Sequence, residues 1–221
     1  MTEKAVVILS GGMDSTTLLY DIVDSGAEVY AVSFDYGQKH IRELFCAKKT
    51  CKILNVPHRI INLKILNDIA PSALTRKDVD VPEGDYKDDN MKQTVVPNRN
   101  MVMLSLATVF AISIKATKLY YGAHSGDHTI YPDCRPEFVE VMKTAIELAD
   151  WNKVELDVPY LFIHKGEIVH RGIKLNVDFK NTWTCYKGKE KACGMCGACR
   201  ERLEAFYYAG IKDPIEYEEF K

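Results

Sequence analysis

The stretch that decides the fold is Ala5-Val-Val-Ile-Leu-Ser-Gly-Gly-Met-Asp-Ser-Thr-Thr-Leu-Leu19, near the start of the chain. Its first part, from Ala5 to Leu9, is a continuous apolar run with β-branched residues, which is typical of a strand covered on both faces. Two glycines interrupt the run, and the residues from Asp14 onward have the pattern of a helix. The stretch therefore predicts a strand, a glycine turn and a helix.

Strand-like and helix-like segments continue to alternate after this unit. Such alternation predicts an α/β fold, with a mostly parallel, Rossmann-like sheet and helices on both faces. Ligands of such sheets bind beyond the carboxyl ends of the strands. The further strands are expected at 29–34, 59–63, 118–123 and 154–158, and the further helices at about 40–54, 101–114, 137–150 and 165–175.

Two of the helical segments carry additional expectations. In the helix at about 40–54 the apolar residues that lie near one face are Ile41, Leu44, Phe45, Cys51 and Leu54. The segment 101–114 is uncharged, but its 14 residues are fewer than the roughly 18 that are needed to span a bilayer. We therefore interpret it as a buried core helix.

Charge and composition limit the kinds of partner. The 29 Lys and Arg residues and 31 Asp and Glu residues give a formal net charge of −2. Because a nucleic-acid surface needs a clustered basic excess, we expect a small-molecule substrate, with neither nucleic acid nor membrane as partner. The N-terminal residues lack the features of an export signal, so we expect a cytoplasmic protein whose seven cysteines stay reduced.

The segment from Thr75 to Thr94 differs from the rest of the chain in composition. Ten of its 20 residues are charged, and it contains Pro82 and Gly84. Two interpretations remain open: a solvated surface loop, or a mobile lid over a site, since loops of this length inside compact domains are often functional.

The turn Ser10-Gly-Gly-Met-Asp-Ser15 has the composition of an anion-binding loop. Its glycines allow close approach of the backbone, and the following helix presents N–H groups and the positive end of its dipole. It is neither a Walker loop nor a dinucleotide fingerprint. Because a carboxylate repels phosphate unless a cation lies between them, we expect Asp14 to help hold Mg²⁺. The alternative is a structural turn in which Asp14 and Ser15 cap the helix.

Four cysteines gather near the C-terminus with the spacing C-x7-C-x2-C-x2-C, and they are Cys185, Cys193, Cys196 and Cys199. Four thiolates suit one tetrahedral Zn²⁺ in a closed structural site. The rival is an iron–sulfur cluster, but a helix start rather than x3-Cys-Pro follows Cys199. We therefore divide the chain into a nucleotide-binding α/β domain at 1–180 and a zinc-binding segment with a helix at 181–221.

The Ser-Gly-Gly-x-Asp-Ser pattern at the end of the first strand resembles the PP-loop of the N-type ATP pyrophosphatases, which have the adenine nucleotide alpha hydrolase-like fold. The resemblance implies that ATP is a co-substrate and that Asp14 and Ser15 act in catalysis. Ser33 and Phe34, after the second strand, would lie near adenine. The implied nucleotide-binding segment consists of Leu9, Ser10, Gly11, Gly12, Met13, Asp14, Ser15, Thr16, Thr17, Leu18 and Leu19.

Three further segments narrow the resemblance: Val96-Pro-Asn-Arg-Asn-Met101, Tyr131-Pro-Asp-Cys-Arg-Pro-Glu-Phe138 and Thr182-Trp-Thr-Cys-Tyr186. With the phosphate loop and the cysteine spacing, they resemble the 7-cyano-7-deazaguanine synthase family of queuosine and archaeosine biosynthesis over nearly the whole chain. The resemblance implies a homodimeric ligase that forms C–N bonds. It would convert 7-carboxy-7-deazaguanine, ammonia and ATP into the nitrile through an adenylated carboxylate and an amide. The family's overall equation is also written with ADP and phosphate, and both forms remain open here.

The same resemblance gives roles to individual residues outside the loop. Lys165 would act in catalysis by neutralising charge that develops on phosphate, although a surface lysine is the alternative. Arg99 and Arg135 would bind a carboxylate or phosphate of the substrates. Tyr131 would stack on the deazaguanine ring, and Asp133 would bind its N1–H and amino group. Surface ion pairs for the arginines and a helix cap for Asp133 are the alternatives.

Two other functions compete with this one. Some PP-loop enzymes adenylate a base of tRNA and then deliver sulfur, but they need an RNA-binding surface that a net charge of −2 does not indicate. The second is a non-enzymatic zinc module that binds nucleic acid or protein, although the tail after Cys199 is acidic. We expect zinc to be a structural staple, so that chelation loosens the tail before it affects phosphate chemistry.

Overall fold

The computed structural model describes residues 3–76, 89–187 and 190–219. The expectation of a surface loop or lid at 75–94 falls mainly on residues 77–88, which lie outside the described residues, so it stays a prediction. The end of that segment forms a short 3₁₀ helix, η1 (Asp89–Thr94).

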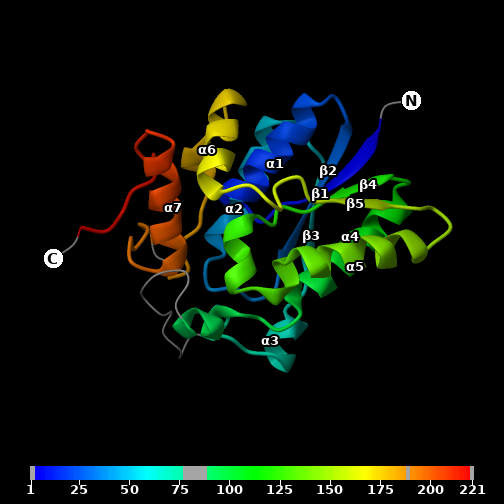
Figure 1. The fold of residues 1–221 in the computed structure, drawn as a ribbon, viewed down its shortest axis with the longest axis horizontal. Coiled ribbons are helices and arrows are strands. Elements are labelled where there is room, and N and C mark those ends of the chain that lie inside the picture. Colours follow the sequence, from blue (N-terminus) through cyan, green and yellow to red (C-terminus); the bar gives the residue numbers. More distant parts are fainter. Residues whose placement is uncertain (1–2, 77–88, 188–189, 220–221) are drawn as a thin grey trace.

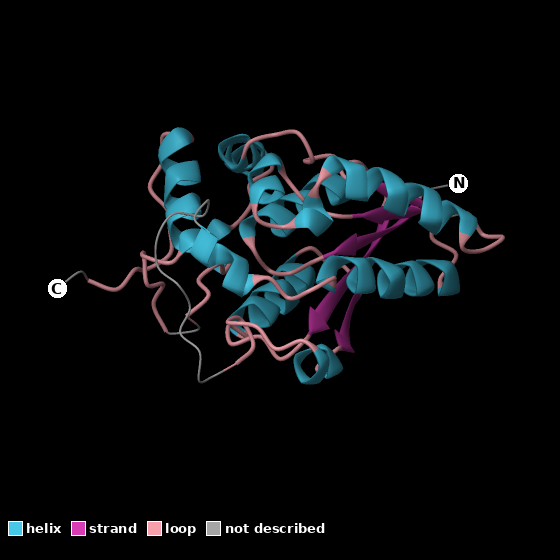
Figure 2. Ribbon diagram, turned by 60° about the horizontal axis from the view of Figure 1, so that its bottom comes forward, coloured by secondary structure: helices cyan, strands magenta, loops and turns pink. Residues whose placement is uncertain are grey.

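The core of the structure is a five-stranded sheet in the order β3-β2-β1-β4-β5, in which every pair of neighbours is parallel (Figures 1 and 2). The chain order reverses direction across β1 and β4, so the segments that follow these two strands diverge and leave room for a ligand. The sheet confirms the predicted α/β fold. The strands are β1 (Lys4–Ile8), β2 (Glu28–Asp35), β3 (His58–Asn62), β4 (Lys118–Tyr120) and β5 (Glu155–Asp157).

Helices cover both faces of the sheet, as Figure 2 shows. Val6 and Ile8 of β1 pack with α4 and α5, whereas Ala5 and Val7 pack with α1, α2 and α6 on the opposite face. Since successive side chains of a strand point to opposite faces, a run that is apolar at every position is buried on both sides. The helices are α1 (Met13–Asp24), α2 (Arg42–Ile53), α3 (Ile65–Ile69), α4 (Arg99–Ser113), α5 (Pro136–Leu148), α6 (Lys165–Lys174) and α7 (Gly197–Tyr208).

The inward face of α2 is narrower than the sequence indicates. Leu44 and Cys51 are buried as expected, but Ile41 and Phe45 are 48% and 62% exposed. The helix begins one residue after Ile41, which acts as its N-cap. Phe45 follows Leu44 directly, and adjacent residues of a helix point about 100° apart. Ile41 and Phe45 therefore lie outside the buried part of the apolar face.

The helix α4 confirms the expected core helix. The segment Lys92–Ser113 is long and apolar enough to cross a membrane by length and composition alone, a test that core helices of soluble proteins also pass. However, Asn98 has a left-handed φ of 57°, so the regular helix begins at Arg99. Its 15 residues rise about 22 Å, less than the roughly 30 Å of a bilayer core. Leu104 and Ala107 are fully buried in the core of the protein.

The chain after residue 180 packs beside α6, and α7 lies at the end of the molecule where the C-terminus also lies (Figure 1). Arg202 of α7 is fully buried, and its guanidinium donates to both carboxylate oxygens of Asp213 at 2.7 and 3.0 Å. Ala192 and Tyr217 form an isolated parallel bridge. These contacts hold the C-terminal tail against the cysteine segment. The division of the chain at residues 180 and 181 stays a prediction.

Candidate active site

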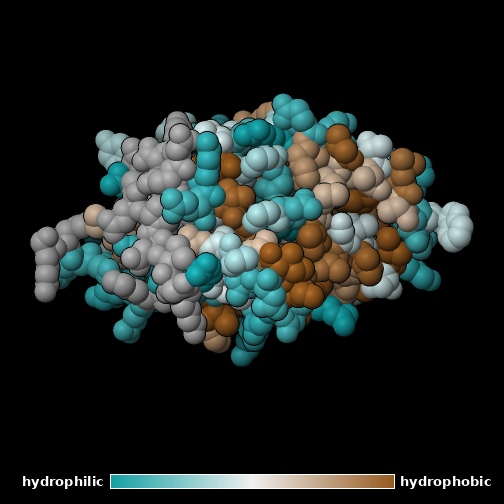
Figure 3. All heavy atoms as spheres, turned by 90° about the horizontal axis from the view of Figure 1, so that it is seen from below, coloured by the Kyte–Doolittle hydropathy of each residue, from teal (hydrophilic) through white to brown (hydrophobic). Residues whose placement is uncertain are grey.

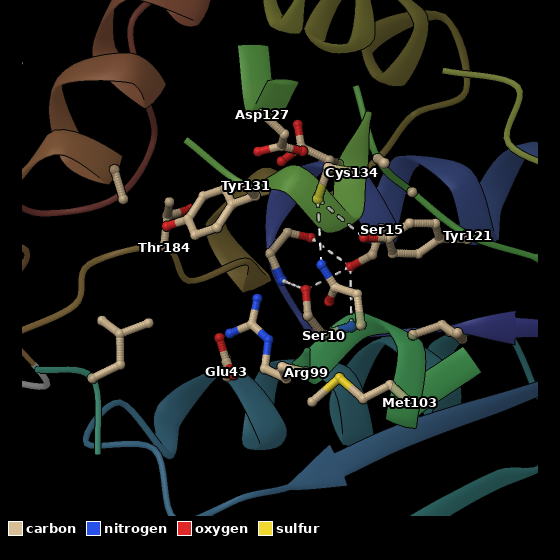
Figure 4. Close-up of a pocket in the computed structure, with 18 of the residues that line it drawn as sticks. Ser10, Ser15, Glu43, Arg99, Met103, Tyr121, Asp127, Tyr131, Cys134 and Thr184 are labelled. Atoms are coloured by element: carbon tan, nitrogen blue, oxygen red, sulfur yellow. Dashed lines mark hydrogen bonds between the residues drawn. The ribbon is translucent and has the colours of Figure 1, made fainter. Parts of the chain in front are cut away.

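A pocket opens beyond the carboxyl ends of β1, β2 and β4, where the strand order reverses (Figure 4). Its walls come from the turn after β1, the loop after β2, the segment after β4 and the amino ends of α4, α6 and α7. In the view of Figure 4, Glu43 and Arg99 lie on the opposite side of the pocket from Asp127. The position is the one expected for a ligand of a parallel sheet.

The turn after β1 is braced by its own hydroxyl groups. The Oγ atoms of Ser10 and Ser15 lie 2.9 Å apart, and Ser15 Oγ accepts a hydrogen bond from the Ser10 backbone N–H at 3.1 Å. Gly11 has φ of +92°, and a Cβ there would collide with the backbone carbonyl of Glu43. The turn therefore requires glycine at this position. Gly12 is the N-cap of α1, and no described side chain caps that helix terminus.

Lys165, the first residue of α6, lies beside this turn. Its side chain is buried, with Nζ 2.6 Å from Glu201 Oε2 and 3.3 Å from Asp14 Oδ2. Burial alone lowers the pKa of an ammonium group, but the charges of Asp14, Glu201 and Asp127 outweigh this effect and raise the pKa of Lys165 above its ordinary value. Lys165 is therefore a fixed cation in the pocket wall, and the alternative of a surface lysine is wrong.

Asp14 retains unused capacity to bind a cation. Its Oδ2 lies 3.3 Å from Lys165 Nζ and 3.9 Å from His124 Nε2, whereas its buried Oδ1 has no hydrogen-bond partner among the described residues. Asp127 contributes a second carboxylate nearby, with Oδ2 3.6 Å from His124 Nε2. Burying an unpaired carboxylate oxygen is costly. Because hard oxygen donors are the ligands that Mg²⁺ prefers, this group of residues fits a divalent cation.

Arg99 and Tyr131 both line the pocket, as the sequence predicts. The Arg99 guanidinium donates to Tyr36 Oη at 3.1 Å and lies 5.2 Å from the centre of that ring. Tyr131 is buried, and its hydroxyl lies 3.1 Å from Thr94 Oγ1 and 3.3 Å from Tyr186 Oη. This part of the pocket combines one cation with several aromatic rings.

Asp133 and Arg135 are not among the described residues that line the pocket. Asp133 Oδ2 accepts a hydrogen bond from the backbone N–H of Asn100 at 3.0 Å, so it caps α4. The helix that follows Asp133 in sequence, α5, has Arg135 as its N-cap instead. Arg135 is exposed, and its Nε donates to the carbonyl oxygen of His128 at 2.8 Å.

The predicted nucleotide-binding segment separates into two groups. Ser10, Gly12, Asp14 and Ser15 line the pocket, and Gly11 shapes the turn. The side chains of the second group are buried and support the turn from behind; Ser33 Oγ, for example, donates to the Leu9 carbonyl oxygen at 2.5 Å. Whether the second group contacts nucleotide stays a prediction. It consists of Leu9, Met13, Thr16, Thr17, Leu18, Leu19, Ser33 and Phe34.

Two parts of the pocket could not be assigned from the sequence alone. The run Asp35-Tyr-Gly-Gln-Lys-His40 places polar residues at the carboxyl end of β2, and this signal is similar to the one after β1. His40 of this run lines the pocket, and so does Glu43, in the first turn of α2 that follows it. Glu201 of α7, the partner of Lys165, gave no signal, because its role depends on the packing of α7 against α6.

The four cysteines of the C-terminal segment converge at one point. Their Sγ atoms all lie within 4.8 Å of one another, and all four side chains are buried. Cys193 Sγ accepts hydrogen bonds from the backbone N–H groups of Met195 and Cys196 at 3.4 and 3.3 Å. Gly194, which lies between Cys193 and Met195 in the sequence, has a left-handed φ of 70°. Four soft donors at this spacing form a site that fits a tetrahedral metal ion.

The cysteine segment also touches the phosphate loop. The backbone N–H of Trp183 donates to the Gly11 carbonyl oxygen at 3.0 Å, and its indole Nε1 donates to the Cys185 carbonyl oxygen at 3.1 Å. Trp183 itself is buried and lines the pocket. The segment that carries the cysteines therefore forms part of the pocket wall. The predicted zinc site is thus connected directly to the phosphate loop through Trp183.

The sheet order and the Ser-Gly-Gly-x-Asp-Ser turn together define a PP-loop protein of the adenine nucleotide alpha hydrolase-like fold. The NMN synthetase from Francisella tularensis has a similar structure, with a TM-score of 0.54 and 13% identity over 96% of this chain and 79% of that chain. The U34-tRNA thiolase NcsA from Methanococcus maripaludis gives a TM-score of 0.52 and 16% identity over 80% of this chain and 58% of that one. At these identities the likeness shows the fold alone.

Sequence comparison identifies the family within this class. The family described as "Queuosine biosynthesis protein QueC" matches residues 4–210. The 7-cyano-7-deazaguanine synthase of Methanoregula boonei is 65% identical over 215 residues, which cover 97% of this chain and 99% of that relative. The synthase of the same name from Caldicellulosiruptor saccharolyticus is 63% identical over 97% of this chain and 96% of its own length. The chain therefore belongs to the QueC family of queuosine biosynthesis enzymes, which confirms the resemblance drawn from the sequence.

Proposed function

We propose that this protein is a C–N bond-forming ligase that converts 7-carboxy-7-deazaguanine and ammonia into 7-cyano-7-deazaguanine at the expense of ATP. The observation that carries the proposal is one pocket with two chemically distinct parts. One part contains the phosphate loop with Asp14 and Lys165, and the other contains Arg99 with the rings of Tyr36 and Tyr131. A nucleotide and a flat, anionic substrate therefore have matching surfaces in the same pocket.

The reaction needs two activations of the same carbon atom. A carboxylate oxygen of the substrate attacks the α-phosphorus of ATP, and the bond to pyrophosphate breaks. Ammonia adds to the acyl adenylate, loses a proton and expels AMP to give the amide. The amide oxygen then attacks a second ATP in the same way, and loss of AMP and of the protons on nitrogen gives the nitrile. Since ammonia is the nucleophile, no catalytic cysteine is required.

The residues of the phosphate loop would act mainly through charge and hydrogen bonds. Negative charge builds up on the departing pyrophosphate, and donors already aimed at such a position stabilise the transition state most effectively. Ser10, Ser15 and the amino end of α1 supply the hydrogen-bond donors. Lys165 supplies the positive charge, and its raised pKa keeps it protonated at neutral pH.

We assign two metals to the two donor sets described above. Zn²⁺ at Cys185, Cys193, Cys196 and Cys199 would have a structural role, since all four ligands come from the protein. Mg²⁺ would be held by Asp14, whose Oδ1 has no other partner among the described residues. When bound, Mg²⁺ neutralises charge on the phosphate oxygens of ATP.

We also propose a homodimer in the cytoplasm. Apolar side chains gather on the face shown in Figure 3, where α4 and α5 lie. On α5, Val141 and Leu148 are 68% and 76% exposed, and on α4 Val109 is 63% exposed. A second copy of the chain is the occupant that the family resemblance implies. Sedimentation analysis tests this: Val141→Glu should yield monomers, whereas Tyr207→Glu on the exposed side of α7 should leave the dimer intact. A monomeric wild-type protein would exclude the proposal.

The activity itself is tested with purified protein, Mg-ATP, ammonia and 7-carboxy-7-deazaguanine, with mass spectrometry of the base as the readout. The nitrile should form, and the amide should appear before it. Asp14→Asn should abolish turnover and leave the zinc content unchanged. Full activity of this variant would contradict the role of Asp14, and absence of nitrile with the wild-type protein would contradict the function.

A further inference from the structure

The first turn of α2, which follows the loop after β2, holds a carboxylate in the pocket that the reaction described above does not use. Glu43 is 9% exposed and lines the pocket. Its Oε1 accepts a hydrogen bond from Gln38 Nε2 at 3.0 Å, and its Oε2 lies 3.2 Å from His40 Nε2. A carboxylate has about four acceptor positions, so the described residues use roughly half of the hydrogen-bonding capacity of Glu43.

Gln38 is locked in the orientation that holds Glu43. Its Oε1 accepts from the backbone N–H of Tyr36 at 2.9 Å, and its Nε2 donates to the carbonyl oxygen of Phe34 at 3.2 Å as well as to Glu43. Gln38 is itself buried. Its amide therefore cannot turn over without losing these bonds, and the Glu43 carboxylate is held in a defined place before any ligand arrives.

His40 gives a second, independent indication that this part of the pocket binds a ligand. Its side chain is 3% exposed and lines the pocket, and its Nδ1 is buried with no hydrogen-bond partner among the described residues. Buried polar atoms are rarely left unpaired. The wall formed by Glu43 and His40 therefore has hydrogen-bonding capacity that the described part of the chain does not satisfy.

We propose that Glu43, held in place by Gln38 and His40, recognises the N1–H and 2-amino group of the deazaguanine substrate, a proposal that rests on the function proposed above. These two donors lie side by side on the six-membered ring, and the two lone-pair sets of one carboxylate match them. Adenine presents one amino donor beside the lone pair of N1 on the same edge, which a carboxylate repels. Glu43 thus distinguishes the substrate base from the base of ATP.

The rest of the same pocket fits the other edge of the substrate. O6 and the 7-carboxylate lie close together on one edge of the bicycle, since C6 and C7 are both bonded to C5; this edge is away from the 2-amino group, and both groups accept hydrogen bonds. A guanidinium can serve such a pair of acceptors with its planar fork. Arg99 lines the same pocket and supplies such a fork. Asp133, the residue that the sequence suggested for base recognition, caps α4 instead.

The test compares two ligands on two proteins. The zinc-loaded protein, saturated with a non-hydrolysable ATP analogue, is titrated with 7-carboxy-7-deazaguanine and with the same molecule lacking the 2-amino group. We expect wild-type protein to bind the latter about 10- to 100-fold more weakly, since a buried acceptor then loses its partner. Glu43→Gln should bind the full substrate more weakly by a similar factor and should discriminate little between the two ligands. Its affinity for the ATP analogue should stay within about threefold of wild type.

Equal affinity of the wild-type protein for both ligands would overturn the proposal, as would equal losses for both ligands in Glu43→Gln. Weaker ATP-analogue binding in the variant would instead assign Glu43 to adenine. If Glu43→Gln does not fold, Glu43→Asp takes its place, because it keeps the negative charge but moves the carboxylate away from the ligand. An unchanged ratio of affinities for the two ligands in Glu43→Asp would also overturn the proposal. Glu140→Gln, on the exposed surface of α5, is the matched control. If the wild-type protein does not bind 7-carboxy-7-deazaguanine at all, the proposed function fails together with the inference.

Discussion

Replacement of Lys165 by methionine tests how the pocket stabilises charge. The substitution keeps most of the side-chain volume and removes the ammonium group that lies 2.6 Å from Glu201 and 3.3 Å from Asp14. Loss of one preorganised donor to a developing oxyanion typically lowers kcat by about 10²- to 10³-fold, which corresponds to about 3–4 kcal/mol. We therefore expect nitrile formation to fall by this factor.

The same substitution leaves two carboxylates facing each other without their cation. Breaking a buried ion pair from one side costs about 3–5 kcal/mol of folding free energy. The activity assay is therefore run well below the melting temperature, with zinc content and calorimetry measured on the same sample. Lys174→Met, at the exposed last turn of the same helix, is the control. A Lys165→Met enzyme whose kcat stays within about threefold of wild type would refute the reasoning.

The glycine turn, the cysteine site and His58 give three further predictions. Gly11→Ala should abolish binding of a non-hydrolysable ATP analogue in an equilibrium titration, because its Cβ meets the Glu43 carbonyl; Gly26→Ala, at a similar φ of +82° with open space around it, should not. Chelation of the metal at the cysteine site should weaken binding of the ATP analogue and change the fluorescence of Trp183, because Trp183 contacts both Gly11 and Cys185. Unchanged nucleotide affinity in metal-free protein would exclude a coupling between the cysteine site and the phosphate loop. Burial and the nearby charge of Lys48 lower the pKa of His58. On acidification the unfolded chain takes up a proton near pH 6.5 while the folded protein does not, so stability should fall below that pH. Melting temperatures at pH 7.5 and 5.5 should show a smaller drop for His58→Gln, and an equal drop would count against this assignment.

Much of the fold could be predicted because its signals are local. The run from Ala5 to Leu9 is apolar at every position, rich in β-branched residues and followed by two glycines, which favours a strand with both faces covered. The cysteine spacing predicts a metal-binding arrangement for a similar reason, since ligands close in sequence can meet after one tight turn. The phosphate loop is contiguous as well, and Ser10, Gly12, Asp14 and Ser15 of this loop line the pocket.

The parts that escaped prediction depend on contacts between distant segments. Asp133 precedes α5 in sequence, but the chain brings its carboxylate to the amino end of α4, which no local pattern reveals. Glu201 looks like one of several acidic residues of the tail until the packing of α7 places it on Lys165. In α2, Phe45 belongs to an apolar pattern but lies just outside the buried stripe. Residue type and spacing thus indicate which chemistry the chain can perform, and the tertiary structure determines which residues of each type lie in the site.

The central claim is that the substrate carboxylate attacks the α-phosphorus of ATP. The most direct test of this claim follows an ¹⁸O label from the substrate into the products. Substrate labelled with ¹⁸O at both carboxylate oxygens is incubated with the protein, Mg-ATP and ammonia, and the nucleotide and phosphate products are examined by mass spectrometry. Activation at the α-phosphorus in this pocket predicts AMP that carries one ¹⁸O atom, with unlabelled pyrophosphate and a nitrile that retains no ¹⁸O. Label in inorganic phosphate, accompanied by ADP, would show attack at the γ-phosphorus and would contradict the account.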